Sequence, residues 1–515
     1  MNSEIFRQYT DNETFEKIVD YPNVTAMWQH SVATYPDTVA IMDNGRTYTY
    51  ARLDAEVSAF RRVLNEQGIT PGSLVGILCP NSFEFVKAYL ACATYGIPTV
   101  LMPAHLDEKT VYGMSMMFGM KAVIYHEALA EKVAIIKQTG GAALIPAESS
   151  AETALPAIPV PTEALCTILF TGGTTGKSKG AKLSHRAVMA GTKNGCYGIK
   201  TIFGERYLLV LPLTHVFGLI RNLMTSLYTG STLYICRNNK DMFRDAAVFK
   251  PTTMILVPAL AEMALGLSKQ FGRNMLGDSL KTVICGAAPV PPYLVREYAR
   301  MGIALLPGYG LTESANLVSG NPEALRKPES VGLIYDGMDY KLVDGELWLK
   351  GVNMMDGYVG GENETAYEDG WFKTGDLARI DEDGYLYITG RTKEIIVLQS
   401  GENVSPAELE VKFYGIDAVQ DCLVYDRTEN GAQILVLEVL PRMSTVKAQG
   451  ITDPEAYIRA EVQRINETLP SFERIQKVIL RDTDFPRTPA MKIDRKKASN
   501  PQCTETRSKP SSARS

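Results

Sequence analysis

The stretch "ALCTILFTGGTTGKSKGAKLSHRAV", Ala164–Val188, runs from an apolar strand into a loop rich in glycine, threonine and lysine. Its "GKS" letters resemble the end of a Walker A loop, which requires glycine, any four residues, and then Gly-Lys-Ser or Gly-Lys-Thr. Counting back from Gly176 places Thr171 where the first glycine would stand. The strict Walker pattern therefore fails by one residue, and the sequence indicates another kind of phosphate-binding loop.

The composition of this loop suits phosphate oxygens. Its glycines allow the backbone to come close and direct N–H groups at an anion. Threonine and serine hydroxyls add donors, and Lys177 and Lys179 add positive charge. The candidate phosphate contacts are Thr171, Gly172, Gly173, Thr174, Thr175, Gly176 and Lys179.

Size and charge limit the class of protein. A chain of 515 residues exceeds one ordinary core, so we expect two or more domains. Hydrophobic residues make up 45% of the chain and charged residues 22%, as in globular proteins. A net charge of −5 gives the whole protein no attraction to nucleic acid or anionic lipid, so we expect no nucleic-acid partner.

Cysteines, histidines and the N-terminal residues indicate the compartment. The eight cysteines lie mostly in apolar runs without a CxxC pair, as expected for buried thiols in a reducing environment. The five histidines lack the spacing of a zinc site. The first twenty residues are polar and acidic, unlike a signal peptide, and no apolar run could span a bilayer. We therefore predict a cytoplasmic protein without a transmembrane segment.

Hydrophobic patterning predicts an α/β fold. Between about residues 40 and 300, short apolar strands alternate with helical segments, as in a doubly wound, largely parallel sheet. The Ala/Pro/Ser-rich stretch 140–165 is interpreted as a surface connection between two subdomains. Beyond residue 330, glycine-punctuated strands predict a small antiparallel, β-barrel-like subdomain. Residues 395–497 predict a compact α+β domain, and 498–515 a disordered tail.

The loop resembles the phosphate-binding signature of the adenylate-forming superfamily. That signature reads T-[SG]-G-[ST]-T-G-x-P-K-G, and this chain departs from it only at Ser178, where proline is usual. The superfamily includes acyl-CoA synthetases, luciferases and peptide-synthetase adenylation domains. Further signature segments follow in the superfamily's order, so the resemblance covers nearly the whole chain, from about residue 25 to 497.

Two of these segments are implied to border the acyl group. "LPLTHVFG" resembles the segment whose histidine or aromatic residue lines the acyl pocket, which implies that His215 lies near the substrate carboxylate. "CGAAPV" resembles a strand end that borders the adenine and the acyl tunnel, which implies roles for Gly286, Ala287 and Ala288.

The hexapeptide "GYGLTE", from Gly308 to Glu313, matches the superfamily motif that holds the nucleotide. The resemblance implies that Tyr309, between Gly308 and Gly310, stacks on adenine. It implies further that Thr312 contacts the α-phosphate and that Glu313 holds Mg²⁺. An aromatic face, a hydroxyl and a carboxylate suit a base, a phosphate and a metal ion.

Segments further along the chain are implied to complete the nucleotide site and the thiol path. "KTGDLARI" supplies Asp376, the superfamily's ribose-binding carboxylate, and "TGRTKE" supplies Arg391 for a phosphate and ribose contact. Lys393 falls at the superfamily's hinge, and Gly401 falls where a loop approaches a pantetheine thiol.

The closing segment, "FPRTPAMKIDR", resembles PRTxxGKxxR and supplies Lys492, with Met491 in place of the usual glycine. A mobile cation that bridges the carboxylate and the α-phosphate stabilises the charge that builds up when these two anions react. The resemblance thus implies an adenylation domain at 1–390, a hinge at 391–394 and a mobile domain at 395–497 that carries Lys492.

The implied reaction joins a carboxylic acid to a thiol. The acid and MgATP give acyl-AMP and pyrophosphate, and a thiol then displaces AMP. Near His215 there is no aspartate to bind an amino group, which favours an uncharged, fatty or other acid. ATP, Mg²⁺ and coenzyme A are the expected cofactor and co-substrates, for a monomer or homodimer.

Three alternatives remain open. One is a ligase that loads the phosphopantetheine arm of an acyl or peptidyl carrier protein in place of CoA. The second is a luciferase-like oxygenase, and the third is a non-catalytic nucleotide-binding protein. The presence of Lys492, Glu313, Asp376 and Arg391 argues against the third.

Overall fold

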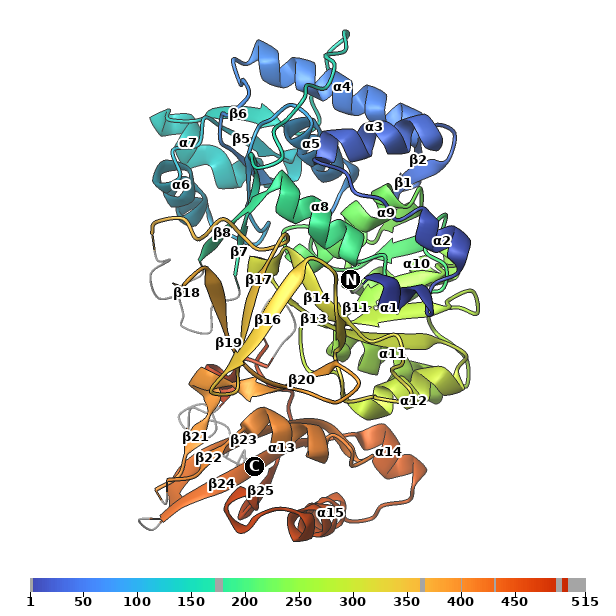
Figure 1. Ribbon diagram of the computed structural model, residues 1–515, viewed down its shortest axis with the longest axis vertical. Helices are drawn as coiled ribbons and strands as arrows, with labels where there is room; N and C mark the ends of the chain where they lie inside the picture. Colours follow the sequence, from blue (N-terminus) through green and yellow to red (C-terminus); the bar gives the residue numbers. More distant parts are fainter. Residues whose placement is uncertain are drawn as a thin grey trace, which may run out of the picture.

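The computed structural model describes residues 3–171, 179–361, 366–399, 401–429, 432–487 and 493–498. Within these ranges the chain forms a six-stranded sheet, a fourteen-stranded sheet, a three-stranded sheet and a two-stranded ribbon. In Figure 1 the six-stranded sheet lies at the top, the fourteen-stranded sheet in the middle, and the C-terminal elements at the bottom. The predicted α/β class is confirmed.

The six-stranded sheet has the order β6-β5-β3-β4-β7-β8 and is parallel except between β7 and β8. Every residue of β3 is buried, as a strand covered on both faces requires. The strands are β3 (Val75–Leu78), β4 (Thr99–Leu101), β5 (Ala122–Tyr125), β6 (Ala143–Pro146), β7 (Leu165–Phe170) and β8 (Gly180–Ser184). The helices of this part are α3 (Val24–Thr34), α4 (Tyr50–Glu66), α5 (Phe83–Ala93), α6 (Glu108–Met117), η1 (Glu127–Val133) and α7 (Ala134–Thr139).

The stretch 140–165 is more than the surface connection that its composition suggested. It contains β6, which pairs in parallel with β5 at the sheet edge. Beyond β6, the Ile158 N–H donates to the Thr94 carbonyl at 3.1 Å, and Val160 is buried. A four-residue edge strand has too little alternation to stand out from Ala- and Pro-rich flanks, so the pattern alone did not reveal it.

The fourteen-stranded sheet begins with a parallel half, ordered β13-β12-β11-β9-β10-β1, with β2 antiparallel at its edge. Its strands are β1 (Val39–Asp43), β2 (Arg46–Thr49), β9 (Arg206–Leu209), β10 (Thr232–Ile235), β11 (Thr253–Leu256), β12 (Thr282–Cys285) and β13 (Ala304–Leu311). The helices here are α1 (Ser3–Arg7), α2 (Asn12–Glu16), α8 (His185–Asn194), η2 (Phe217–Met224), α9 (Thr225–Tyr228), η3 (Asn239–Asp241), α10 (Met242–Phe249), α11 (Pro258–Phe271) and α12 (Pro292–Arg300).

The antiparallel strands expected beyond residue 330 are present, and their hydrogen bonding continues into the parallel half. Strand β13 pairs in parallel with β12 and antiparallel with β14, so one strand joins the two kinds of sheet. The antiparallel strands are β14 (Asn316–Gly320), β15 (Gly332–Ile334), β16 (Met338–Val343), β17 (Glu346–Gly351), β18 (Tyr367–Glu368), β19 (Trp371–Ile380) and β20 (Tyr385–Arg391).

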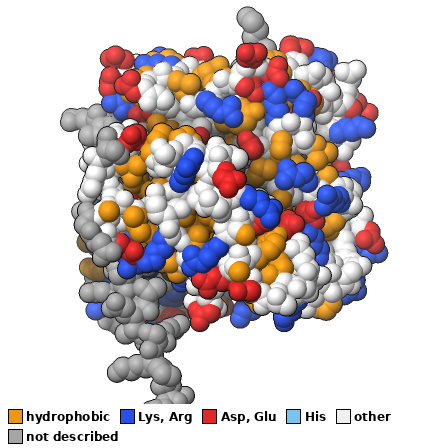
Figure 2. All heavy atoms as spheres, turned by 90° about the horizontal axis from the view of Figure 1, so that it is seen from below, with side chains coloured by type: hydrophobic (Ala, Val, Ile, Leu, Met, Phe, Trp, Pro, Cys, Tyr) orange, Lys and Arg blue, Asp and Glu red, His pale blue; other side chains and the backbone are white. Residues whose placement is uncertain are grey.

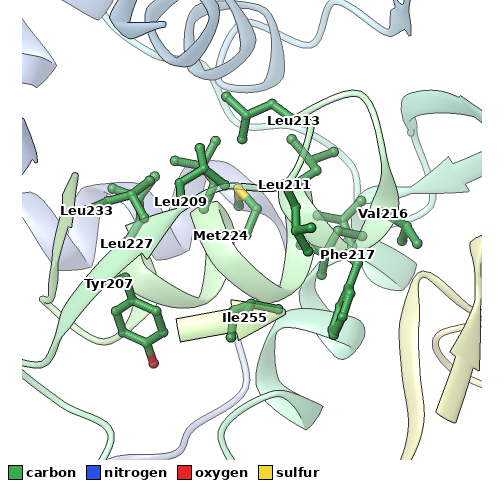
Figure 3. Close-up of a cluster of buried hydrophobic side chains, with 14 of the residues drawn as sticks. Tyr207, Leu209, Leu211, Leu213, Val216, Phe217, Met224, Leu227, Leu233 and Ile255 are labelled. Carbon is green, nitrogen blue, oxygen red and sulfur yellow. The ribbon is translucent and has the colours of Figure 1, made fainter. Parts of the chain in front are cut away.

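The helical segment η2 is a fully buried π-helix that packs on the parallel half of this sheet. Figure 3 shows side chains of η2 and α9, such as Phe217 and Leu227, converging with those of β9, β10 and β11. A Cβ at Gly218 would lie 2.1 Å from the Pro212 carbonyl oxygen, so only glycine allows the helix to begin this close to the preceding turn. The turn that carries His215 is thereby held against the core.

The C-terminal part has its own sheet and its own apolar core. Strands β23 and β24 are antiparallel, β25 joins β24 in parallel, and β21 and β22 form the ribbon. Buried Leu409, Phe413, Val424, Leu437 and Val462 belong to this core. The elements are η5 (Thr392–Glu394), β21 (Ile396–Val397), β22 (Asn403–Val404), α13 (Pro406–Phe413), β23 (Val419–Glu429), β24 (Ala432–Pro441), α14 (Met443–Ala448), α15 (Pro454–Thr468), η6 (Ser471–Glu473), β25 (Lys477–Leu480) and α16 (Arg495–Ala498).

Polar contacts join the C-terminal part to the rest of the chain. Arg442 donates from Nη2 to the Tyr293 hydroxyl at 2.6 Å and lies 3.6 Å from the Glu262 carboxylate. The Ser405 hydroxyl donates to the Thr389 carbonyl at 2.5 Å. The two apolar cores are separate clusters, so the two parts of the protein fold around different centres.

Charges of both signs are interspersed on the face seen from the C-terminal end (Figure 2). In the part of the chain that the structure describes, no helix is long and apolar enough to cross a membrane. The seven cysteines of that part are all buried and unpaired.

Because the His185 side chain is buried, we expect the free energy of unfolding to depend on pH. Its side chain, at the start of α8, accepts from the Val24 N–H at Nδ1, and burial lowers its pKa from 6.5 to about 4. Because the unfolded chain binds this proton more readily, the stabilisation is complete above pH 6.5 and is lost as the pH falls towards 4. The loss is on the order of 3 kcal/mol.

We expect wild-type protein to lose more stability to urea between pH 7.5 and pH 5 than His185→Asn does, because the asparagine oxygen can still accept from Val24 but carries no proton to titrate. Exposed His30 offers a matched control, since His30→Asn should leave the pH profile unchanged. An equally steep profile in His185→Asn would contradict the assignment.

Candidate functional site

The glycine-rich loop connects two antiparallel strands, β7 and β8, whose ends pair at Phe170 and Gly180. The Thr171 N–H donates to the Lys179 carbonyl at 2.9 Å, and the Lys179 N–H donates to the Thr171 hydroxyl at 3.3 Å. A Walker loop would lead from a strand into a helix, so this strand-to-strand connection agrees with the failure of the Walker pattern. The predicted contacts Gly172, Gly173, Thr174, Thr175 and Gly176 lie outside the described residues.

One residue that sequence reasoning missed, Tyr358, connects the base of this loop to Glu313. The backbone around Tyr358 runs along β8, and the Val359 N–H donates to the Gly180 carbonyl at 2.9 Å. The Tyr358 hydroxyl donates to Glu313 Oε1 at 2.6 Å, and the Lys179 ammonium lies 5.0 Å from the centre of the Tyr358 ring. The only signal in the sequence was an aromatic residue among glycines, in "DGYVGG".

The segment "GYGLTE" forms the end of β13 and the short helix η4 (Thr312–Ser314). A Cβ at Gly310 would lie 2.0 Å from the Asn316 carbonyl oxygen, so β13 and β14 can approach this closely only with glycine there. Thr312 is buried, and the Met355 N–H donates to the Glu313 carbonyl at 2.8 Å. This backbone contact and Tyr358 together orient Glu313 towards the base of the loop.

A second cluster joins Tyr309, Asp376 and Arg391. Asp376 on β19 and Arg391 on β20 are register partners, and Arg391 Nε lies 2.8 Å from Asp376 Oδ1. The Tyr309 hydroxyl donates to Asp376 Oδ2 at 2.6 Å. Burial, with the Asp376 charge, raises the pKa of Tyr309 well above 10, so its hydroxyl remains a neutral donor.

The charges of this cluster are matched. Burial is the largest influence and opposes the charge on Arg391, but Asp376 and the other acidic groups around it together outweigh burial and raise the pKa of the guanidinium above its usual value. Asp376 itself is only 2% exposed. A buried carboxylate can accept hydrogen bonds from two vicinal hydroxyls, and a guanidinium beside it can bind a phosphate.

The predicted acyl-side residues meet at the carboxyl ends of β12 and β13. A Cβ at Gly286 would lie 2.8 Å from the Gly308 carbonyl oxygen and 3.5 Å from Phe217 Cζ. Ala287, which precedes Ala288, adopts a left-handed conformation with φ of 67°, so the chain turns directly after the end of β12. Such strand ends in open α/β sheets are where ligands bind.

His215 lies on the turn between β9 and η2. Its Nδ1 accepts from the Phe217 N–H at 3.3 Å. This local hydrogen bond fixes the ring orientation and connects His215, through Phe217, to the strand ends at Gly286.

The predicted hinge and thiol-path residues lie in the C-terminal part. Lys393 is exposed in η5, directly after β20. Gly401 takes φ of 95° in the turn between β21 and β22, a conformation that favours glycine. Lys492 and Met491 lie outside the described residues; their neighbour Ile493 pairs with Arg487 in an isolated bridge.

The carboxylates of the site indicate what kind of metal it could hold. Among the described residues, no group of three or more His, Cys, Asp or Glu side chains could hold an ion. Glu313 is thus a single carboxylate beside hydroxyl and ammonium groups. Mg²⁺ is commonly held by one or two carboxylates together with substrate phosphates, so the donor set fits a metal that arrives with a nucleotide.

Comparison with known proteins identifies the class of enzyme. A feruloyl-CoA synthase from Amycolatopsis sp is 30% identical over 412 residues, covering 76% of this chain and 82% of the relative. The medium-chain fatty-acid–CoA ligase of Escherichia coli (strain K12) is 29% identical over 429 residues, covering 74% of each protein. The protein is an acid–thiol ligase.

Family models match most of the chain, and solved structures share its fold. Residues 28–359 match the AMP-binding enzyme model and residues 393–502 match the AMP-binding enzyme C-terminal domain, so the chain belongs to the AMP-binding enzyme family. The fold is shared with an anthranilate CoA ligase in complex with anthranoyl-AMP, at a TM-score of 0.82 and 21% identity over 92% of this chain and 96% of that one. It is also shared with the Bacillus subtilis o-succinylbenzoate CoA synthetase in complex with ATP and magnesium. That comparison has a TM-score of 0.77 and 22% identity, and it covers 92% of this chain and 99% of the other.

The Tyr309–Asp376–Arg391 cluster generates a prediction for nucleotide affinity. We expect Asp376→Asn to weaken AMP binding roughly 10- to 100-fold, because it removes a charged acceptor that neutral amides replace poorly. Isothermal titration calorimetry with AMP measures this change. Asp383→Asn, an exposed change in the same β19–β20 hairpin, should leave the affinity unaltered. Equal affinity in Asp376→Asn and wild-type protein would remove Asp376 from the nucleotide site.

Proposed function

We propose that the protein activates a carboxylic acid with MgATP and transfers the acyl group to coenzyme A. The acid's carboxylate oxygen attacks the α-phosphorus, a P–O bond forms, and the bond to pyrophosphate breaks. The thiolate sulfur then attacks the acyl carbon, a thioester forms, and AMP leaves. The observation that carries this proposal is the pair of clusters Lys179–Tyr358–Glu313 and Tyr309–Asp376–Arg391, which meet at the "GYGLTE" segment that ends β13.

The two clusters have different roles in the first half-reaction. Tyr309 would lie against the adenine, with Asp376 accepting from the ribose hydroxyls and Arg391 near the phosphate. Thr312 would contact the α-phosphate and the loop 171–179 the β- and γ-phosphates. Glu313 would hold Mg²⁺, which when bound neutralises phosphate charge as the pyrophosphate leaves. The hydrogen bond from Tyr358 would keep the Glu313 carboxylate pointing at that position.

His215 and Lys492 would act on the acid. His215, on the turn that Gly218 holds against the core, would face the reacting carboxylate from the acyl side. Lys492 would bridge this carboxylate and the α-phosphate, because two anions approach one another and charge builds up on phosphorus. Lysine suits this role as a compact charge on a flexible stem.

Rotation of the C-terminal part, 395–497, about Lys393 would exchange Lys492 for a thiol path past Gly401. Separate apolar cores on either side of residues 391–394 support this boundary, because rotation would leave both cores intact. The polar contacts of Arg442 with Tyr293 and Glu262 could be exchanged for water at little cost. Domain motions of this kind gate many ligases and kinases.

Coenzyme A is the acceptor we propose, since relatives at 28–30% identity carry names of CoA ligases. The buried, unpaired cysteines of the described residues suit a reducing compartment such as the cytoplasm. The relatives' names include both aryl and fatty acids, so the class of acid has to be inferred from the residues of the pocket.

Pyrophosphate exchange with short, medium, long and aromatic acids tests this function, followed by thioester formation with CoA or a holo-carrier protein. We expect acid-dependent exchange and faster product formation with CoA. Faster product formation with the carrier protein would show that the carrier protein, and not coenzyme A, is the acceptor. Absence of exchange with every acid would contradict ligase activity.

Lys492 should separate the two half-reactions. We expect Lys492→Ala to lower acid-dependent pyrophosphate exchange roughly 100-fold or more, as the loss of a preorganised charge does. Thioester formation from supplied acyl-AMP should be largely spared. Exposed Lys497 provides the matched control, and Lys497→Ala should keep both rates. An equal loss in both half-reactions in Lys492→Ala would contradict the two-pose mechanism.

A further inference from the structure

A small cavity lies against Gly308 of β13. Its volume is about 20 Å³, room for one or two water-sized groups. Its lining includes Tyr197, Arg221, Ile284, Leu306, Gly308 and Tyr335. Gly308 thus borders both the candidate nucleotide site and this cavity.

Arg221 in this cavity is buried without a counter-charge. It is 1% exposed, and its Nε and Nη1 are buried with no hydrogen-bond partner. Within the described ranges, no carboxylate forms an ion pair with it. Buried guanidinium groups are normally paired, because a desolvated charge is costly when it is left alone.

A second buried arginine of the same protein shows the usual arrangement. Arg61, 2% exposed, donates from Nε to the Leu155 carbonyl at 2.8 Å, from Nη1 to the Thr94 hydroxyl and from Nη2 to the Ser58 hydroxyl at 2.7 Å. All three of its nitrogens are therefore satisfied within the fold. Arg221 differs because the fold supplies no such acceptors for Nε and Nη1.

The surroundings of Arg221 offer neutral groups. Burial raises the pKa of Tyr207 and Tyr335, with the Arg221 charge lowering it to a smaller extent, so both phenols stay protonated. The Tyr207 hydroxyl points out of the apolar cluster in Figure 3, and its contact with Arg221 is with a neutral group, which leaves the guanidinium charge without a counter-ion. Burial likewise raises the pKa of the Cys196 thiol. The described groups around Arg221 are thus neutral, and a bound anion would supply the charge that the guanidinium lacks.

The position of Arg221 connects it to the acyl side of the site. It lies on the π-helix η2, four residues after Phe217 and six after His215. Phe217 lies against the Gly286 position, and Gly286 in turn adjoins Gly308, which lines the cavity. A substrate that reacts beside His215 could therefore extend past Gly308 towards the guanidinium. π-Helical turns often occur at functional sites.

We propose that Arg221 is a specificity-determining residue that binds a second carboxylate at the far end of the acid, so that the enzyme activates dicarboxylic acids. This inference rests on the proposed function and revises its substrate. The lack of an aspartate near His215 argues against an ammonium tail, but it says nothing against an anionic one. The cavity admits a compact terminal group rather than a long alkyl chain, and a carboxylate can accept from two guanidinium nitrogens at once.

Adenylation of length-matched acids tests the proposal. The pairs are butanedioate with butanoate, hexanedioate with hexanoate, and benzene-1,4-dicarboxylate with benzoate, each in acid-dependent pyrophosphate exchange with the full-length enzyme. We expect at least one diacid to exceed its matched monoacid roughly tenfold or more in kcat/KM. If monoacids are activated and every diacid is poorer, the proposal is wrong while the ligase function stands; if no acid is activated, the proposed function itself fails.

Arg221→Met tests the residue directly. We expect kcat/KM for the diacid to fall roughly 30-fold or more, with the monoacid unchanged or improved, because a neutral side chain of similar length fills the site. Arg221→Lys should recover part of the diacid activity, and surface Arg300→Met should match wild type. An equal loss with both acids would assign Arg221 a purely structural role. If Arg221→Met does not fold, the comparison of diacids with monoacids in the wild-type enzyme still tests the proposal.

Discussion

The site depends on one strand, β13, that is parallel to β12 on one side and antiparallel to β14 on the other. The antiparallel approach leaves no room for a Cβ at Gly310, which would lie 2.0 Å from the Asn316 carbonyl oxygen. Tyr309, between the two glycines of the motif, is held where its hydroxyl reaches Asp376. Backbone spacing therefore places the aromatic ring and the carboxylate relative to one another before any ligand binds.

Hydrogen bonds from distant segments complete this arrangement. Tyr358, whose ring lies 5.0 Å from the Lys179 ammonium, orients Glu313 from 45 residues further along the chain. Asp376 and Arg391 meet because β19 and β20 form a hairpin that positions them as register partners. The buried Asp376 carboxylate thus has a partner of opposite charge and Glu313 a hydrogen-bond donor, which lowers the free-energy cost of holding these charges in the fold.

Two buried arginines distinguish structural from functional use of charge. Arg61 is fully hydrogen-bonded within the fold, so its position is explained by stability alone. Arg221 is equally buried but lacks partners for two nitrogens, in a cavity that adjoins the reaction centre through Gly308. The separation of the C-terminal core from the large core of the preceding part is a comparable signal, because it leaves a junction that contains polar contacts between two packed regions.

The sequence by itself determined the α/β class, the order of the signature segments and, through them, the family, because these features reside in local composition and spacing. It did not reveal the edge strand β6, the Tyr358–Glu313 contact or the isolation of Arg221. Arg221 lies six residues after His215 in the sequence. Its lack of partners for Nε and Nη1, however, depends on which groups the surrounding elements place beside it. Only the tertiary structure decides which buried charges are paired, because pairing depends on groups that are remote in sequence and close in space.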